Sequence, residues 1–140
     1  MLSPSLEDYL EEAYRLSLYN EEIRVKDIAR CLNFSMPSVV KGLKKLDELG
    51  YIRYKPYQKI KLLDKGKRKG KFLVDRNSIL KQFITIIGAE CDIDQEAEAM
   101  EHYFSIETIK SIEKLIVVLK ENEDIAKKIQ DLQMNSVLDI

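Results

Sequence analysis

The sequence predicts a mainly α-helical protein with a small β-wing, in which an N-terminal winged helix-turn-helix precedes a helical C-terminal part. Three observations predict this fold: two short helices joined by a tight turn, two alternating strand-like runs directly after them, and helical periodicity through most of the remaining chain. With 140 residues, 45% hydrophobic and 34% charged, the chain has room for one ordinary domain or two small packing units. We expect residues 1–70 to form the winged domain and residues 71–140 the helical one, linked by a long helix over about 64–88.

The first three helices follow from caps and spacing. Residues 5–8 read Ser-Leu-Glu-Asp, which has the form of a capping box, so the first helix is expected to begin near Ser5. A short second helix is expected over residues 26–32. Asn33 and Phe34 form a tight turn, and Ser35 caps a third helix that ends at Gly50.

The third helix separates an apolar face from a basic one. At about 100° per residue, lysines project from the side opposite the leucines and valines. The basic side consists of Lys41, Lys44 and Lys45, and the apolar side consists of Val39, Val40, Leu43, Leu46 and Leu49. A second short helix that presents lysines to solvent is typical of a helix-turn-helix.

The segment after the third helix predicts a hairpin wing. Residues 52–54 and 60–62 alternate like strands, and the basic segment 55–59 joins them. Asp64 is expected to cap the long connecting helix, which Gly88 ends. Three further helices are expected over residues 93–103, 105–120 and 123–133.

Charge is distributed unevenly along the chain, although the net charge is only −1. Residues 41–71 contain twelve Lys and Arg against three Asp and Glu, a local charge of +9, whereas residues 72–140 contain seven against fourteen. A basic segment within an acidic protein indicates a polyanion-binding surface, and a solvated charged face is the alternative on charge alone.

The predicted DNA contacts lie on the third helix and the wing. The start of an inserted helix reads base edges and offers free N–H groups to phosphates, while Lys, Arg and hydroxyl groups hold the backbone. The candidate DNA-binding residues are Ser35, Met36, Pro37, Ser38, Lys41, Lys44, Lys45, Tyr57, Gln58 and Lys59. We therefore predict a double-stranded DNA operator as partner.

A second group of polar residues is rich in carboxylates. Asp8 and Glu11 are three residues apart on the first helix, and Glu98, Glu101 and His102 share one face of a later helix. Four carboxylates and the single imidazole of the chain suit a hard or borderline divalent ion. Each cluster alone is more often a solvated polar face.

The order of these parts resembles the DtxR/MntR family of metal-dependent transcription repressors, especially its shorter manganese-responsive branch. The resemblance covers nearly the whole chain, and its most specific motif is Glu98-Ala99-Met100-Glu101-His102. The other matching segments are residues 3–11, 25–29, 38–47, 62–67 and 86–88.

The resemblance implies a homodimer that binds palindromic operators near metal-uptake genes and uses residues 71–140 for metal binding and dimerisation. It implies Asp8, Glu11, Glu98, Glu101 and His102 as ligands of Mn²⁺, with Fe²⁺ or another divalent transition metal as the alternative. An ion held by both parts would lock the DNA-binding module onto the dimer core. Because the chain ends at residue 140, the SH3-like domain of the iron-responsive branch is expected to be absent.

One residue departs from the family pattern. Where the family has a histidine ligand in Val-x-Arg-His, residues 74–77 read Val-Asp-Arg-Asn. Asn77 offers an amide oxygen, which is a weaker and harder donor than imidazole. The alternative function is therefore a winged-helix regulator whose metal dependence is altered or lost.

Other classes of function are disfavoured. The chain contains no nucleophile elbow, no HExxH motif and no phosphate-binding glycine loop, so a hydrolase that uses the carboxylates is a weak hypothesis and no small-molecule substrate is predicted. The longest aliphatic run, residues 115–119, is too short to span a membrane, and no basic-then-apolar leader precedes Ser3. A cytoplasmic protein with two reduced structural thiols, Cys31 and Cys91, is expected.

Overall fold

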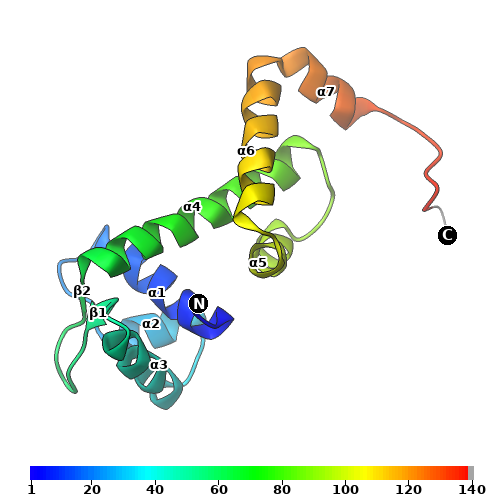
Figure 1. Cartoon of the computed structure of the whole chain (residues 1–140). Helices are drawn as coiled ribbons and strands as arrows, with labels where there is room; N and C mark the ends of the chain where they lie inside the picture. The colour runs from blue at the N-terminus through cyan, green and yellow to red at the C-terminus, as the bar shows by residue number, and fades with distance from the viewer. Residues whose placement is uncertain (139–140) are drawn as a thin grey trace. The chain divides into compact units, whose positions relative to one another are not determined.

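The computed structural model describes residues 1–138 and divides into two compact units, Met1–Asp75 and Arg76–Ile140. The last two residues of the predicted helical domain therefore lie outside the described part of the chain. Helix α4 (Asp64–Ile86) begins in the first unit and ends in the second. Helices dominate both units (Figure 1). Among the described residues, no helix is both long and apolar enough to cross a membrane.

Helix α1 (Pro4–Ser17) begins one residue earlier than predicted. Its N-cap is Ser3, whose Oγ accepts a hydrogen bond of 3.3 Å from the backbone N–H of Leu6. Pro4 follows at the first helical position, where its missing N–H costs nothing. The capping role predicted for Ser5 is therefore wrong.

Helices α2 (Val25–Leu32) and α3 (Met36–Glu48) form the predicted helix-turn-helix. Asn33 ends α2 in the left-handed conformation at φ 56°, which short polar side chains tolerate. Ser35 caps α3 by accepting a hydrogen bond of 3.3 Å from Ser38 N–H, as predicted. Gly50 follows the helix at φ 80°, which explains why the helix ends there.

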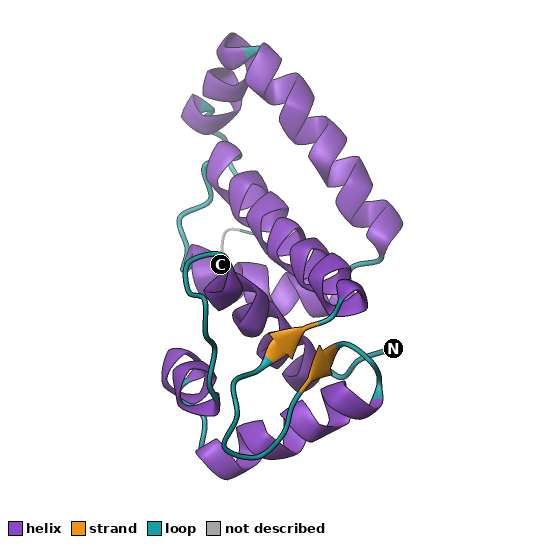
Figure 2. Cartoon of the chain, turned by 90° about the vertical axis from the view of Figure 1, so that its left-hand side faces the viewer, coloured by secondary structure: helices purple, strands orange, loops and turns teal. Residues whose placement is uncertain are grey.

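The wing is an antiparallel pair of two-residue strands, β1 (Ile52–Arg53) and β2 (Lys61–Leu62), drawn as orange arrows in Figure 2. Both strands are shorter than the predicted three-residue runs. The backbone N–H of Tyr54 donates instead to Asp47 Oδ2 at 3.0 Å. Ile60 pairs with Ile23, which precedes α2, rather than with β1. The wing is thereby attached to the helix-turn-helix on both sides.

The core of the first unit joins α1, α2, α3 and the wing. The start of α4 packs onto this core through two glycines. A Cβ on Gly66 would lie 2.0 Å from the carbonyl oxygen of Tyr51, and one on Gly70 would lie 2.5 Å from Tyr14 Cβ. The fully buried side chains of this core are Leu10, Ala13, Ile28, Val39, Leu43, Leu46, Ile52 and Leu73.

The second unit contains the end of α4, α5 (Ile93–Tyr103), α6 (Ile106–Glu121) and α7 (Glu123–Asp131). Gly88 adopts φ 74° after α4, and α5 has the predicted bounds. Helix α6 is shifted by one residue because Ser105 is its N-cap, and α7 ends two residues before the predicted limit. A small core of four buried residues, Leu80, Ile84, Ala97 and Ile109, joins α4, α5 and α6. The predicted fold class is confirmed.

Candidate metal-binding and DNA-binding sites

The reading head, defined as residues 35–45, presents its first turn to solvent. Ser35, Met36, Pro37 and Ser38 are all exposed. The two serine hydroxyls lie 2.8 Å apart, and Ser35 also accepts from the backbone of Ser38. These groups lie at the N-terminus of α3, where unsatisfied N–H groups and the helix dipole attract anions.

The lysines of the reading head differ in their partners. Lys41 and Lys44 are exposed and form no ion pair within residues 1–138. Lys45 lies 3.5 Å from Glu48 Oε2, one turn further along α3. Two of the three predicted lysines therefore carry charge that no carboxylate of residues 1–138 pairs with.

The wing tip, defined as residues 55–59, is a tight turn that projects an aromatic ring. The N–H of Gln58 donates to Lys55 C=O at 3.1 Å. Tyr57 is 100% exposed and adopts φ 63°, which is costly for a residue with a Cβ. Lys59 lies 3.6 Å from Glu22.

The reading head and the wing share one recess of about 370 Å³. Met36 and Val40 line it from α3, and Tyr54, Pro56 and Tyr57 line it from the wing. Two segments that were predicted separately to contact DNA therefore border the same hollow within the first unit.

The carboxylates of the first unit lie on α1. Asp8 and Glu11 are half-buried and one turn apart. Glu11 Oε2 lies 3.7 Å from Arg15 on the same helix. Helix α1 also contributes Tyr9, Leu10 and Ala13 to the core of the first unit. The packing of these three residues therefore fixes the position of the two carboxylates within that unit.

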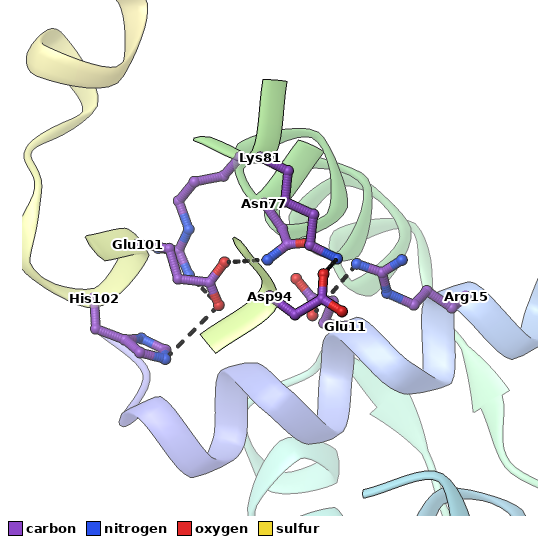
Figure 3. A network of polar contacts seen from close by, with 8 residues as sticks. Glu11, Arg15, Asn77, Lys81, Asp94, Glu101 and His102 are labelled. Atoms are coloured by element: carbon purple, nitrogen blue, oxygen red, sulfur yellow. Dashed lines mark hydrogen bonds and ion pairs between the residues drawn. The ribbon is translucent and has the colours of Figure 1, made fainter. Parts of the chain in front are cut away.

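In the second unit, Glu101 is the centre of a polar cluster (Figure 3). Its side chain is only 3% exposed. Asn77 Nδ2 donates to Glu101 Oε2 at 3.1 Å, while the Arg76 guanidinium lies 3.9 Å and His102 Nε2 lies 3.8 Å from Oε1. The structure thus brings together three of the predicted ligands of this unit. Glu98 lies one helical turn before Glu101 and is exposed.

Burial raises the pKa of Glu101 above its usual value, because water no longer solvates the carboxylate. Its hydrogen bond with Asn77 and the nearby charges of Arg76 and His102 lower the pKa in opposition, and Glu98 adds to the rise. Desolvation is the largest of these effects. A buried acidic group whose ionised form is under-solvated gains from a nearby cation.

The geometry around Glu101 fits a divalent ion. Ligand atoms of transition metals lie about 2.0–2.2 Å from the ion, so two ligands on one ion are at most about 4.4 Å apart. The 3.8 Å separation of Glu101 Oε1 from His102 Nε2 is within that limit. Carboxylate oxygen with one imidazole is also the donor set that Mn²⁺ and Fe²⁺ accept.

The cation of this cluster, Arg76, was not among the residues predicted from the sequence. Arg76 is 8% exposed and directs its guanidinium toward Glu101. Arg76 stands directly before Asn77, in the motif that the resemblance uses, but its partner is 25 positions away on α5. The available signal was an arginine in an otherwise acidic half of the chain.

The comparisons agree on a family. Residues 1–60 match the sequence model "Iron dependent repressor, N-terminal DNA binding domain", and residues 63–130 match "Iron dependent repressor, metal binding and dimerisation domain". The chain is 40% identical to the HTH-type transcriptional regulator MntR of Lysinibacillus sphaericus over 93% of its length and 94% of the relative. It is 37% identical to the regulator of the same name from Bacillus subtilis, over 95% of this chain and 94% of that relative.

Solved structures show the same likeness. The manganese regulator SloR superposes with a TM-score of 0.72 at 27% identity, over 82% of this chain and 54% of SloR. The metal-dependent transcriptional regulator MtsR superposes with a TM-score of 0.69 at 27% identity, over 82% of this chain and 54% of MtsR. The chain thus spans about half the length of these two proteins. The prediction of a transcriptional regulator rather than an enzyme is confirmed, and the chain belongs to the DtxR/MntR family of metal-dependent repressors.

Proposed function

We propose that this regulator is a Mn²⁺-responsive repressor that acts in the cytoplasm as a homodimer on palindromic operators near metal-uptake genes. The observation that carries the proposal is the buried Glu101 carboxylate, with His102 Nε2 3.8 Å from one of its oxygens. In a family of metal-dependent repressors, a buried acid beside an imidazole is a site prepared for a cation. Fe²⁺ or another divalent transition metal is the alternative occupant.

The proposed ligands come from both units. Asp8 and Glu11 would supply oxygens from α1, and Glu98, Glu101 and His102 would supply oxygens and an imidazole nitrogen from α5. Asn77 would contribute only through its amide oxygen. The bound ion supplies positive charge that cancels repulsion among the carboxylates. Its higher affinity for the DNA-binding arrangement would favour that arrangement.

The DNA-binding proposal assigns base contacts to the start of the reading head, Ser35 to Ser38. Phosphate contacts are assigned to Lys41, Lys44 and Lys45, and backbone or minor-groove contacts to Tyr57, Gln58 and Lys59 of the wing tip. The shared recess and the uncompensated charges of Lys41 and Lys44 support this assignment. Residues 1–70 would then form the DNA-binding domain and residues 71–140 the metal-binding and dimerisation domain.

The deciding experiment compares operator binding with and without metal. A duplex selected from a random library by the Mn²⁺-loaded protein serves as probe, and fluorescence anisotropy measures its affinity in Mn²⁺, in Mg²⁺ and in EDTA. We expect tight binding only with Mn²⁺. Equal affinity in EDTA would contradict the metal switch while leaving DNA binding intact.

A second candidate function, DNA binding without a metal switch, has one observation in its favour. The Glu101 carboxylate already receives a hydrogen bond from Asn77 and has the Arg76 guanidinium nearby, so its charge has internal partners. Calorimetry with Mn²⁺ on wild type and on Asn77→His separates the two functions. If wild type binds no Mn²⁺ and the variant does, metal dependence has been lost through Asn77. Ser78→His is the matched control, since it adds an imidazole at the exposed neighbouring position.

A further inference from the structure

A second cationic feature lies outside the reading head and the wing tip. An open groove of about 640 Å³ runs between the end of α1, strand β2 and the first turns of α4, all within the first unit. Four cations line it, Lys61 from β2 and Lys67, Arg68 and Lys71 from α4, and this set is called the basic groove below. Only one acidic residue, Glu21, lines it among the described residues.

Most of this charge is uncompensated. Lys61, Lys67 and Arg68 are exposed and form no ion pair within the described part of the chain. Lys71 lies 2.6 Å from Asp75, and this contact raises the pKa of Lys71, so the lysine stays protonated at neutral pH. Lys69, which does not line the groove, lies 3.6 Å from Glu7.

The fold holds these like charges together. Gly70 lets α4 approach α1 so closely that a Cβ there would meet Tyr14, and Tyr14 lines the same groove. Lys67 and Lys71 are four residues apart on one helix face, where like charges repel, and Asp75 offsets the charge of Lys71 alone. A groove in which several cations lie beside Tyr14 is chemically suited to bind the phosphate backbone of DNA.

The basic groove continues the wing. Lys59 of the wing tip precedes Lys61 of β2 by only two residues, so the last cation of the wing tip and the first cation of the groove are close along the chain. A backbone that contacts the wing tip can therefore extend along β2 into the groove.

We propose that the basic groove binds the phosphate backbone of DNA flanking each half-site, without reading its sequence. The inference rests on the proposed contact of the reading head and wing with DNA, and it adds a second contact surface to it. The residues that line the groove all lie within the first unit, and none of them is a proposed metal ligand. It extends the footprint of each protomer beyond the bases that α3 reads.

The test is the salt dependence of binding to a 40-bp duplex that carries the selected site at its centre. The double variant Lys67→Ala/Arg68→Ala removes two exposed charges from the groove. The matched control, Lys110→Ala/Lys114→Ala, removes two exposed lysines from α6 in the second unit. Thermal melting checks that each variant is folded.

Losing two phosphate contacts should reduce the slope of log affinity against log salt by about 1.8. Between 50 and 200 mM salt, wild type would then lose about tenfold more affinity than the groove variant. Hydroxyl-radical protection should also shrink on the flank of the half-site. Lys67→Arg/Arg68→Lys keeps the charge and should restore both the slope and the protection.

A groove variant with the slope and footprint of wild type would overturn the proposal, as would an equal loss of slope in the α6 control. Lys41→Ala/Lys44→Ala distinguishes this failure from failure of DNA binding itself. If that reading-head variant weakens binding while the groove variant does not, only the groove is misassigned. If neither variant affects binding, the proposed DNA contact of the first unit fails as well.

Discussion

The side-chain amide of Asn77 on α4 donates a hydrogen bond of 3.1 Å to the carboxylate of Glu101 on α5, and both residues are buried. A carboxylate only accepts, so the amide can face it only through its N–H₂ group. The hydrogen bond ties α4 to α5 within the second unit. Asn77 is therefore part of the fold of the metal-free protein.

The first prediction follows from the hydrogen bond between Asn77 and Glu101. Asn77→Ala removes a donor from a buried acceptor and should lower the free energy of unfolding by about 1–3 kcal/mol in EDTA. Asn77→Asp, which has the same shape, should destabilise more at neutral pH because it sets a second carboxylate against Glu101. Urea denaturation measures both. Mn²⁺ should rescue Asn77→Asp and not Asn77→Ala, and equal responses of the two variants would contradict the prediction.

Glu101 itself gives the second prediction. Burial raises the pKa of Glu101 in the folded protein. The carboxyl group of Glu101 therefore binds its proton more tightly in the folded state than in the unfolded state. The contribution of Glu101 to metal-free stability is therefore most favourable below about pH 4.3, the ordinary Glu value, and falls as the pH rises through the raised pKa. Glu101→Gln should remove this loss, so that the variant in EDTA is at least as stable as wild type at pH 7.

The same variant should lose its response to metal. Mn²⁺ should raise the melting temperature of wild type through preferential binding to the folded state, and this rise should disappear in Glu101→Gln. Glu113→Gln, which changes an exposed carboxylate on α6, is the control and should behave as wild type. A melting temperature of Glu101→Gln that still rises with Mn²⁺ would remove Glu101 from the ligand set.

What the sequence could predict was the part of the fold set by neighbouring residues. The cap at Ser35 and the turn at Asn33 depend on side chains within three or four positions, and both were predicted. At the start of α1 two serines compete, and Pro4 decides for Ser3 because proline is favoured at the first helical position. The capping pattern at Ser5 matched equally well, so a rule based on the pattern alone chose wrongly.

Contacts between distant residues were beyond local rules. Ile60 pairs with Ile23 across 37 positions, and no periodicity of either segment encodes that bridge. The candidate metal cluster shows the same division. Its acids and imidazole were predicted from helical spacing, while the hydrogen bond from Asn77 and the approach of Arg76 depend on how α4 packs on α5.

The third prediction concerns the close packing of α4 in the first unit. A Cβ on Gly66 would lie 2.0 Å from the backbone oxygen of Tyr51, which cannot move without shifting the chain before β1. Gly66→Ala should therefore destabilise the protein by about 1–3 kcal/mol, despite the better helix propensity of alanine. Gly50→Ala is the comparison, because its cost comes from φ 80° alone with nothing within 4 Å. Denaturation should rank Gly66→Ala as the less stable of the two.

The fourth prediction tests the strained wing tip. Tyr57 is fully exposed at φ 63°, so its ring contributes no packing that offsets the backbone cost of about 1–2 kcal/mol. Tyr57→Asn places a residue there that tolerates this conformation. Stability should stay equal or rise slightly, while affinity for the selected duplex should fall. Unchanged DNA affinity would mean that the ring does not contact DNA.

The fifth prediction separates the three lysines of the reading head. Lys41 and Lys44 have no ion pair within residues 1–138, whereas Lys45 lies 3.5 Å from Glu48. A lysine already paired gives up part of its attraction to phosphate, so Lys41→Ala and Lys44→Ala should weaken duplex binding more than Lys45→Ala. Each of the first two should reduce the salt slope by about 0.9. Gel-shift titrations at several salt concentrations measure this order, and Glu48→Ala should strengthen binding by freeing Lys45. If all three lysine variants bind the duplex as tightly as wild type does, α3 is not the helix that enters the major groove of the DNA.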